Sequence, residues 1–166
     1  MPQRHLKLFS ISIFALRFLL PAWIGAAILF VITSVAEQTS RFIDTFTRDQ
    51  LATIRFPLYY KFGTVIYAVS VVSCIVAWKT SGAACHKRAV MVLVLMAVST
   101  VIFALDYFVV YSPLQALIIP AGQVRTQEFV RLHNLSRHAN ELHLLITLAA
   151  AVLVTMPLKP ETGPVK

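Results

Sequence analysis

The sequence predicts an all-α membrane protein: a four-helix transmembrane bundle with an interfacial amphipathic helix. Hydrophobic residues make up 58% of the 166 residues, against roughly 45–50% in soluble domains. Charged residues make up only 13%, and the mean hydropathy is +0.75. A soluble domain of this size buries too small a share of its surface to hide so much apolar material. Lipid is therefore expected to be the main solvent of the chain.

Four apolar runs are long enough to cross a hydrocarbon core of about 30 Å, which takes roughly 20 helical residues. They cover residues 18–35, 62–78, 89–111 and 142–158. Backbone amides find no water partner in hydrocarbon, so each run is expected to be helical. We expect residues 1–158 to form one four-span domain. Residues 159–166 contain two prolines and a glycine and predict a disordered tail.

The first run has a second interpretation. Arg4 and Lys7 precede it, and the tripeptide Ser34-Val35-Ala36 is typical of a signal-peptidase site. A secretory signal usually has about 7–15 apolar residues, fewer than this run has. A retained helix is therefore favoured, and a cleaved signal peptide stays the alternative.

The connections between the runs differ in kind. Residues 79–88 form a tight turn, so the second and third runs should be antiparallel neighbours. The segment Glu37–Lys61 alternates apolar and charged residues near helical spacing, which predicts a helix lying in the membrane interface. Residues 112–123 contain two prolines and a glycine and should be irregular.

The net charge of +8 does not indicate nucleic-acid binding, because the basic residues lie in caps between the apolar runs. Such caps suit helix ends beside anionic lipid headgroups, so the expected partner is the lipid bilayer. With four spans, both termini and the 79–88 turn share one side. Basic residues are denser on that side, which predicts a multi-pass protein of the cell membrane with both termini in the cytoplasm.

A polar stripe precedes the fourth run. On a helix, four side chains between residues 131 and 145 fall within an arc of roughly 100°. They are His133, Ser136, Arg137 and Asn140. Asp106 lies inside the third run near the same end, and a carboxylate in a membrane span needs a partner. These five residues form the candidate site, with Arg137, Asn140 and His143 as expected partners of Asp106.

Two interpretations of this site remain open. The first is a polar cluster that only joins the third and fourth helices of a non-catalytic protein. The second is a small transporter or a ligand- or metal-binding protein, for which four helices would require a homo-oligomer. His133, His138 and His143 are five residues apart and do not share one metal-binding face. The sequence has no nucleophile elbow and no cofactor motif, so we expect neither an enzyme nor a cofactor.

Three short stretches resemble the transmembrane protein 205-like family, whose bacterial members form the domain-of-unknown-function family numbered 4149. WIG at residues 23–25 resembles the family's Trp-x-Gly, and RFPLY at residues 55–59 resembles its Phe-Pro-x-Tyr. FVRLH at residues 129–133, with Ser136 and Asn140, resembles its closing Phe-x-x-x-His-x-x-Ser-x-x-x-Asn pattern. Asn134 stands where that pattern has glycine.

The resemblance implies a four-helix integral membrane protein without an established biochemical activity. Eukaryotic members of the family are associated with tolerance of toxic metal-containing compounds, which implies transport or trafficking. The residues carried over are His133, Ser136 and Asn140, which belong to the stripe that helical spacing selects.

Overall fold

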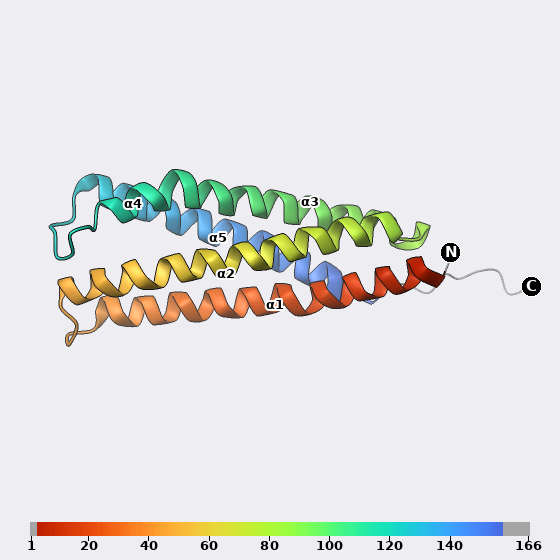
Figure 1. The fold of residues 1–166 in the computed structure, drawn as a ribbon, viewed down its shortest axis with the longest axis horizontal. Helices are drawn as coiled ribbons and strands as arrows, with labels where there is room; N and C mark the ends of the chain where they lie inside the picture. The colour runs from red at the N-terminus through yellow and green to blue at the C-terminus, as the bar shows by residue number, and fades with distance from the viewer. Residues whose placement is uncertain (1–2, 158–166) are drawn as a thin grey trace, which may run out of the picture.

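The computed structural model describes residues 3–157, which fold into four long helical stretches lying side by side (Figure 1). Helix α1 covers Gln3–Thr39 and α2 covers Thr45–Thr80. Helix α3, Ala83–Leu105, continues through a π-helix, η1 (Asp106–Tyr111), into the short α4 (Ser112–Ala116). Helix α5 covers Gln127–Thr155.

Among the described residues, four stretches are long and apolar enough to cross a membrane: residues 3–39, 45–80, 83–116 and 127–155. They contain the predicted runs, apart from the last residues of the fourth, because α5 ends at Thr155. The prediction of an all-α four-helix bundle is confirmed, and the chain is a multi-pass membrane protein. The tail predicted at 159–166 lies outside the described residues.

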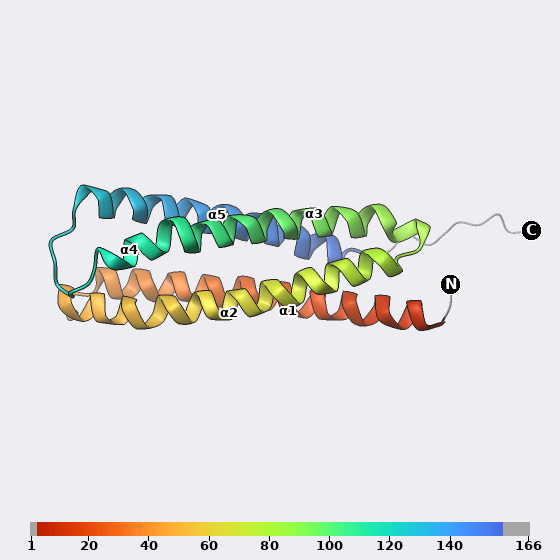
Figure 2. The same cartoon turned by 45° about the horizontal axis from the view of Figure 1, so that its top comes forward.

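The helices close into a ring in which α1 packs against α2 and α5, and α3 packs against the same two helices. Figures 1 and 2 show an elongated bundle, with the start of α1, the α2–α3 turn and the end of α5 at one end. We call this the termini end. The loops 40–44 and 117–126 lie at the other end, the loop end. The second and third spans are antiparallel neighbours, as expected.

The segment Glu37–Lys61, expected to be a separate interfacial helix, is mostly the first part of α2, which continues to Thr80. One of its charged residues, Arg55, contacts α1 and does not lie on a membrane surface. Arg55 forms an ion pair with Glu37 and donates a hydrogen bond to Thr33 Oγ1 at 2.8 Å. The expectation failed because α1 extends beyond its apolar run and gives this part of α2 a helix to pack against.

Helices α1 and α2 are longer than a bilayer requires. Their 37 and 36 residues correspond to about 55 Å of helix, against a hydrocarbon core of about 30 Å. The apolar runs end near Val35, Phe62 and Tyr111 on the loop-end side. The loop end of the bundle therefore extends past the hydrocarbon into the headgroup region.

Trp23 is fully buried at the centre of the bundle. Its ring lies 5.0 Å from that of Tyr59 and 5.9 Å from that of Phe103, centroid to centroid. Gly63 makes this packing possible, because a Cβ there would lie 2.7 Å from ring atoms of both Trp23 and Phe103. By contrast, large side chains such as Phe14 (73% exposed) face outward, where lipid surrounds them.

The loop end is closed by defined turns. Asp44 caps α2, and the hydrogen bond from the Thr47 backbone N–H to its carboxylate, 2.7 Å long, lowers the pKa of that carboxyl.

The region 112–123 is irregular only in part. Residues 112–116 are helical, since Pro113 lies in the first turn of α4, where a missing N–H costs little. In the loop that follows, Gly122 has a φ of +86°.

Candidate functional site

A cavity of about 340 Å³ lies between α1, α2, α4 and α5 towards the loop end. Four of the five predicted site residues line it: His133, Ser136, Arg137 and Asn140. All four come from α5, where the spacing of the polar stripe brings them onto one face. The stripe therefore lines this cavity, with Ser136 and Asn140 partly buried and His133 and Arg137 exposed.

The opposite wall of this cavity is largely apolar. Helix α1 contributes Phe30, Val31 and Val35, and α2 contributes Phe56 and Tyr59. The polar side chains of Ser34 and Gln38 also line it, one and two helical turns nearer the end of α1 than Phe30. The cavity thus has one polar wall, from α5, and one apolar wall, from α1 and α2.

Asn140 lies between the cavity and the core. Its Oδ1 accepts hydrogen bonds from Tyr59 Oη at 2.7 Å and from His143 Nε2 at 2.8 Å. Since Oδ1 is an acceptor, His143 carries its proton on Nε2 and its Nδ1 accepts from Tyr67 Oη at 2.9 Å. A neutral imidazole satisfies both contacts, and the side chain of His143 is fully buried.

A buried polar cluster continues from His143 into the core. Tyr67 Oη lies 2.8 Å from Ser99 Oγ and 2.9 Å from Thr147 Oγ1. Ser99 Oγ also donates to the backbone carbonyl of His143 at 2.9 Å. We call Tyr67, Ser99, His143 and Thr147 the inner polar cluster. It joins α2, α3 and α5, so residues outside the predicted site hold the third and fourth spans together.

His143 was predicted only as a partner for Asp106, and the other members of the inner polar cluster were not predicted. Tyr67 and Ser99 are polar residues within apolar runs, and each could have been interpreted as an ordinary tolerated residue. The available signal was the combination of His143 and Thr147, four residues apart on one helix face.

Asp106 is buried, with 3% of its surface exposed, and it is the first residue of the π-helix η1. Its Oδ2 accepts a hydrogen bond from Tyr60 Oη at 2.7 Å. Its other oxygen, Oδ1, is buried and has no hydrogen-bond partner among residues 3–157. Ser136 lies beside both side chains, and Tyr60 and Ser136 line the cavity. Asp106 therefore stands directly behind the cavity wall.

The expected network of Asp106 with Arg137 and Asn140 does not occur among the hydrogen bonds of the described residues. Asn140 is engaged by Tyr59, as described above. Arg137 is 56% exposed and lies 3.9 Å from Glu141, its neighbour one turn along α5. The prediction considered only α3 and α5, whereas α2 supplies the tyrosine that reaches Asp106.

A smaller cavity of about 60 Å³ adjoins the first one and shares Phe56, Leu114 and His133 with it. Buried Asp49 and Arg125 line it and form an ion pair. Asp49 Oδ2 also accepts the backbone N–H of Gly122 at 2.8 Å, which ties the 117–126 loop to α2.

Aromatic stacking orders the other residues of the smaller cavity. The guanidinium of Arg125 lies over the ring of Phe129, 4.3 Å from its centroid. The imidazole of His133 is nearly parallel to the same ring, at 5.8 Å between centroids. Phe129 thus contacts both the cationic side chain of Arg125 and the imidazole of His133.

A hollow of about 590 Å³ lies on the outside of the bundle between α2 and α3. Its lining includes Val65 and Phe108, which are 61% and 71% exposed. Tyr60 lines this hollow as well as the inner cavity. Its walls are largely apolar and lie on the outer surface of the bundle.

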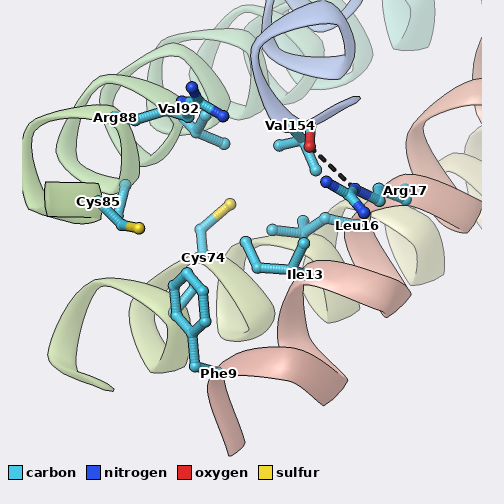
Figure 3. Close-up of a pocket in the computed structure, with 11 residues that line it drawn as sticks. Phe9, Ile13, Leu16, Arg17, Cys74, Cys85, Arg88, Val92 and Val154 are labelled. Atoms are coloured by element: carbon cyan, nitrogen blue, oxygen red, sulfur yellow. Dashed lines mark hydrogen bonds between the residues drawn. The ribbon is translucent and has the colours of Figure 1, made fainter. Parts of the chain in front are cut away.

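At the termini end, Cys74 and Cys85 line a cavity of about 40 Å³, and Figure 3 shows both thiols directed into it. This space holds only a few water-sized groups. Arg17 Nε donates to the Val154 carbonyl at 3.0 Å (Figure 3), and Arg88 donates to the Met156 carbonyl at 2.7 Å. Both arginines thereby cap the end of α5.

Over residues 3–157, no group of three or more histidine, cysteine, aspartate or glutamate side chains could hold a metal ion. His138 is exposed and lies 3.2 Å from Glu141 on the outer surface of α5. The polar side chains described above can instead bind a molecule through hydrogen bonds and charge.

Comparisons with protein-family models, curated proteins and solved structures gave no significant match to this chain. The resemblance to the transmembrane protein 205-like family therefore stays a prediction, and the function has to be inferred from the site.

Proposed function

We propose that this membrane protein is a non-catalytic binding protein for a small amphipathic molecule, held in the 340 Å³ cavity near the loop end. The observation that carries the proposal is that His133, Ser136, Arg137 and Asn140 line one cavity. A polar stripe that served only to join helices would bond to its neighbours throughout, whereas His133 and Arg137 form no hydrogen bond to another helix in the described part of the chain. The inner polar cluster already provides that connection.

The cavity has the size and lining of a ligand site. Small-molecule sites usually measure about 300–1,000 Å³ and combine apolar walls with a few polar groups. The apolar wall from Phe30, Val31 and Phe56 suits a hydrocarbon chain or ring. The α5 wall offers an imidazole, a hydroxyl and a guanidinium to the polar part of the same molecule.

The position of the cavity also favours an amphipathic ligand. The apolar runs end at the level of its lining residues, near Val35 on α1 and Phe62 on α2. A molecule dissolved in one leaflet would meet the cavity at the depth where lipid headgroups begin. Its apolar part would then lie at the depth of the hydrocarbon, and its polar part at the depth of the headgroups, both in the bilayer and in the cavity.

The other parts of the proposal follow from the sequence. Both termini are placed in the cytoplasm, because basic residues are denser on that side. The cavity would then open towards the outer leaflet. The proposal includes membership in the transmembrane protein 205-like family. It also includes assembly into a homo-oligomer if the protein moves the ligand across the membrane. A reporter fused to the C-terminus tests the orientation.

Filling the cavity tests the binding function. Val31 lines the cavity, and Val31→Trp places a large ring inside it. We expect native mass spectrometry from phosphatidylcholine nanodiscs to show one molecule of dodecanol bound per wild-type chain, and none bound to the variant.

The matched control is Val101→Trp on α3, where the valine is 57% exposed to lipid and lies outside the cavity lining. This variant should bind dodecanol as the wild type does. Equal binding by both tryptophan variants would show that the probe binds elsewhere on the protein, and the proposal would be wrong.

A further inference from the structure

We infer that the ligand of this cavity is an anionic, single-chain amphiphile whose carboxylate is bound in the adjoining 60 Å³ cavity by Arg125 and Tyr111. The inference rests on the proposed function and adds the chemical class of the ligand. The chain of the ligand would lie in the larger cavity and its headgroup in the smaller one.

Two residues that line the smaller cavity carry a buried donor that lacks an acceptor. Arg125 uses Nη2 for Asp49, and its Nη1 is buried without a hydrogen-bond partner in the described part of the chain. The Tyr111 hydroxyl is buried and equally unpartnered within residues 3–157. Both residues line the cavity. Buried donors without partners are unfavourable, so an acceptor is expected there.

The acceptor should be an anion. Asp49 is the acidic residue in the lining, and its two oxygens already accept from Arg125 and Gly122. Asp106 lies outside the lining of both cavities. Arg137 adds a second positive charge to the wall of the larger cavity. A carboxylate accepts two hydrogen bonds at once, and because Asp49 already balances the charge of Arg125, the positive charge that favours an anion comes from Arg137.

The sizes of the two cavities divide the ligand into a small head and a longer chain. The smaller cavity of about 60 Å³ has room for about four water-sized groups, which suits a carboxylate and excludes a sugar or nucleotide. Phe56, Leu114 and His133 line both cavities and mark the junction between them. A molecule that crosses this junction places its first methylenes against Phe56 and Leu114.

The test compares dodecanoate with dodecanol, which share a chain and differ in the headgroup. Both are titrated into phosphatidylcholine nanodiscs, and binding is measured by native mass spectrometry. We expect wild-type protein to bind dodecanoate about tenfold more tightly than dodecanol, since a charge-assisted hydrogen bond contributes an effect of that order.

Tyr111→Phe removes a hydroxyl that has no partner in the described protein, so the fold should persist. It should weaken dodecanoate binding about tenfold and leave dodecanol binding unchanged. Arg125→Lys keeps a positive charge beside Asp49 and removes the second guanidinium nitrogen, and it should have the same selective effect. Tyr107→Phe, in the same π-helix but lining the outer hollow, is the control and should change neither.

The possible outcomes separate the two proposals. If neither probe binds to the wild type, the proposed function fails. If both probes bind equally well, or if Tyr111→Phe and Arg125→Lys leave dodecanoate binding unchanged, the cavity binds amphiphiles without recognising a carboxylate. In that case water occupies the smaller cavity, and only the further inference is overturned.

Discussion

Tyr60 Oη donates a hydrogen bond of 2.7 Å to Asp106 Oδ2, and this contact joins the middle of α2 to the first residue of the π-helix. It is the one hydrogen bond that the Asp106 side chain makes among residues 3–157, because Oδ1 is unpartnered there. π-Helical turns are rare and recur at functional sites. The carboxyl that interrupts the third span is thus held by a tyrosine on the cavity wall.

Removal of the Tyr60 hydroxyl should destabilise the bundle. In Tyr60→Phe the buried carboxyl of Asp106 loses its partner, and we expect the free energy of unfolding to fall by about 1–3 kcal/mol. Unfolding in mixed SDS micelles measures it. Tyr111→Phe also removes one hydroxyl, but an unpartnered one, and it should change the stability by less than about 0.5 kcal/mol. Equal losses in the two variants would contradict the assigned role of Tyr60.

The inner polar cluster should contribute a measurable but modest stabilisation. Ser99→Ala removes the hydrogen bond from Ser99 Oγ to the His143 carbonyl, which joins α3 to α5. Hydrogen bonds between membrane helices are worth about 0.6 kcal/mol on average and up to about 1.7 kcal/mol. We expect a loss near the upper value, since Tyr67 and Thr147 also contact this hydroxyl.

Thr100→Val is the control for Ser99→Ala. Its hydroxyl donates only within its own helix, to the Met96 carbonyl at 2.6 Å, so removing it breaks no contact between helices. The unfolding free energies of both variants are compared in the same micelles. A loss in Thr100→Val as large as that in Ser99→Ala would show that the inner polar cluster adds nothing specific.

A methyl group at Gly63 should disturb the aromatic core. The added Cβ would lie 2.7 Å from Phe103 Cζ and from Trp23 Cη2, and both rings are buried. Overpacking of this kind costs about 1–3 kcal/mol. Gly25→Ala is the matched control, because the described structure has nothing within 4 Å of its Cβ position. Thermal unfolding in detergent should show a lower Tm for Gly63→Ala alone, and an unchanged Tm would contradict the close packing.

The helices could be predicted because lipid imposes helical structure on any long apolar run. The ends of the helices could not, since α1 and α2 continue beyond the hydrocarbon and stabilise each other there. The ion pair between Arg55 and Glu37 shows how this happens. In the sequence, each of these charged residues fits a helix surface in contact with lipid headgroups. Only the pairing of α1 and α2 shows that Arg55 and Glu37 contact each other.

The site residues that lie on one helix could be predicted from their spacing. The contacts that these and other polar residues make between helices could not. The spacing of His133, Ser136 and Asn140 placed them on one face of α5, and that face lines the cavity. The partners of buried polar groups come from distant segments: Tyr67 is 76 positions from His143. Such pairs depend on how helices rotate and cross, and the π-helix after Asp106 further changes which residues face inward.

The ion pair of Asp49 and Arg125 should hold the 117–126 loop against α2. In Asp49→Asn the guanidinium loses its charged partner, although the amide oxygen can still accept from Gly122. We expect amide hydrogen exchange in residues 117–126 to become several-fold faster, because local opening costs less. Glu141→Gln breaks an exposed pair with a 3.9 Å separation and should leave exchange unchanged. Unaltered exchange in Asp49→Asn would show that the turn at Gly122 orders the loop without the ion pair.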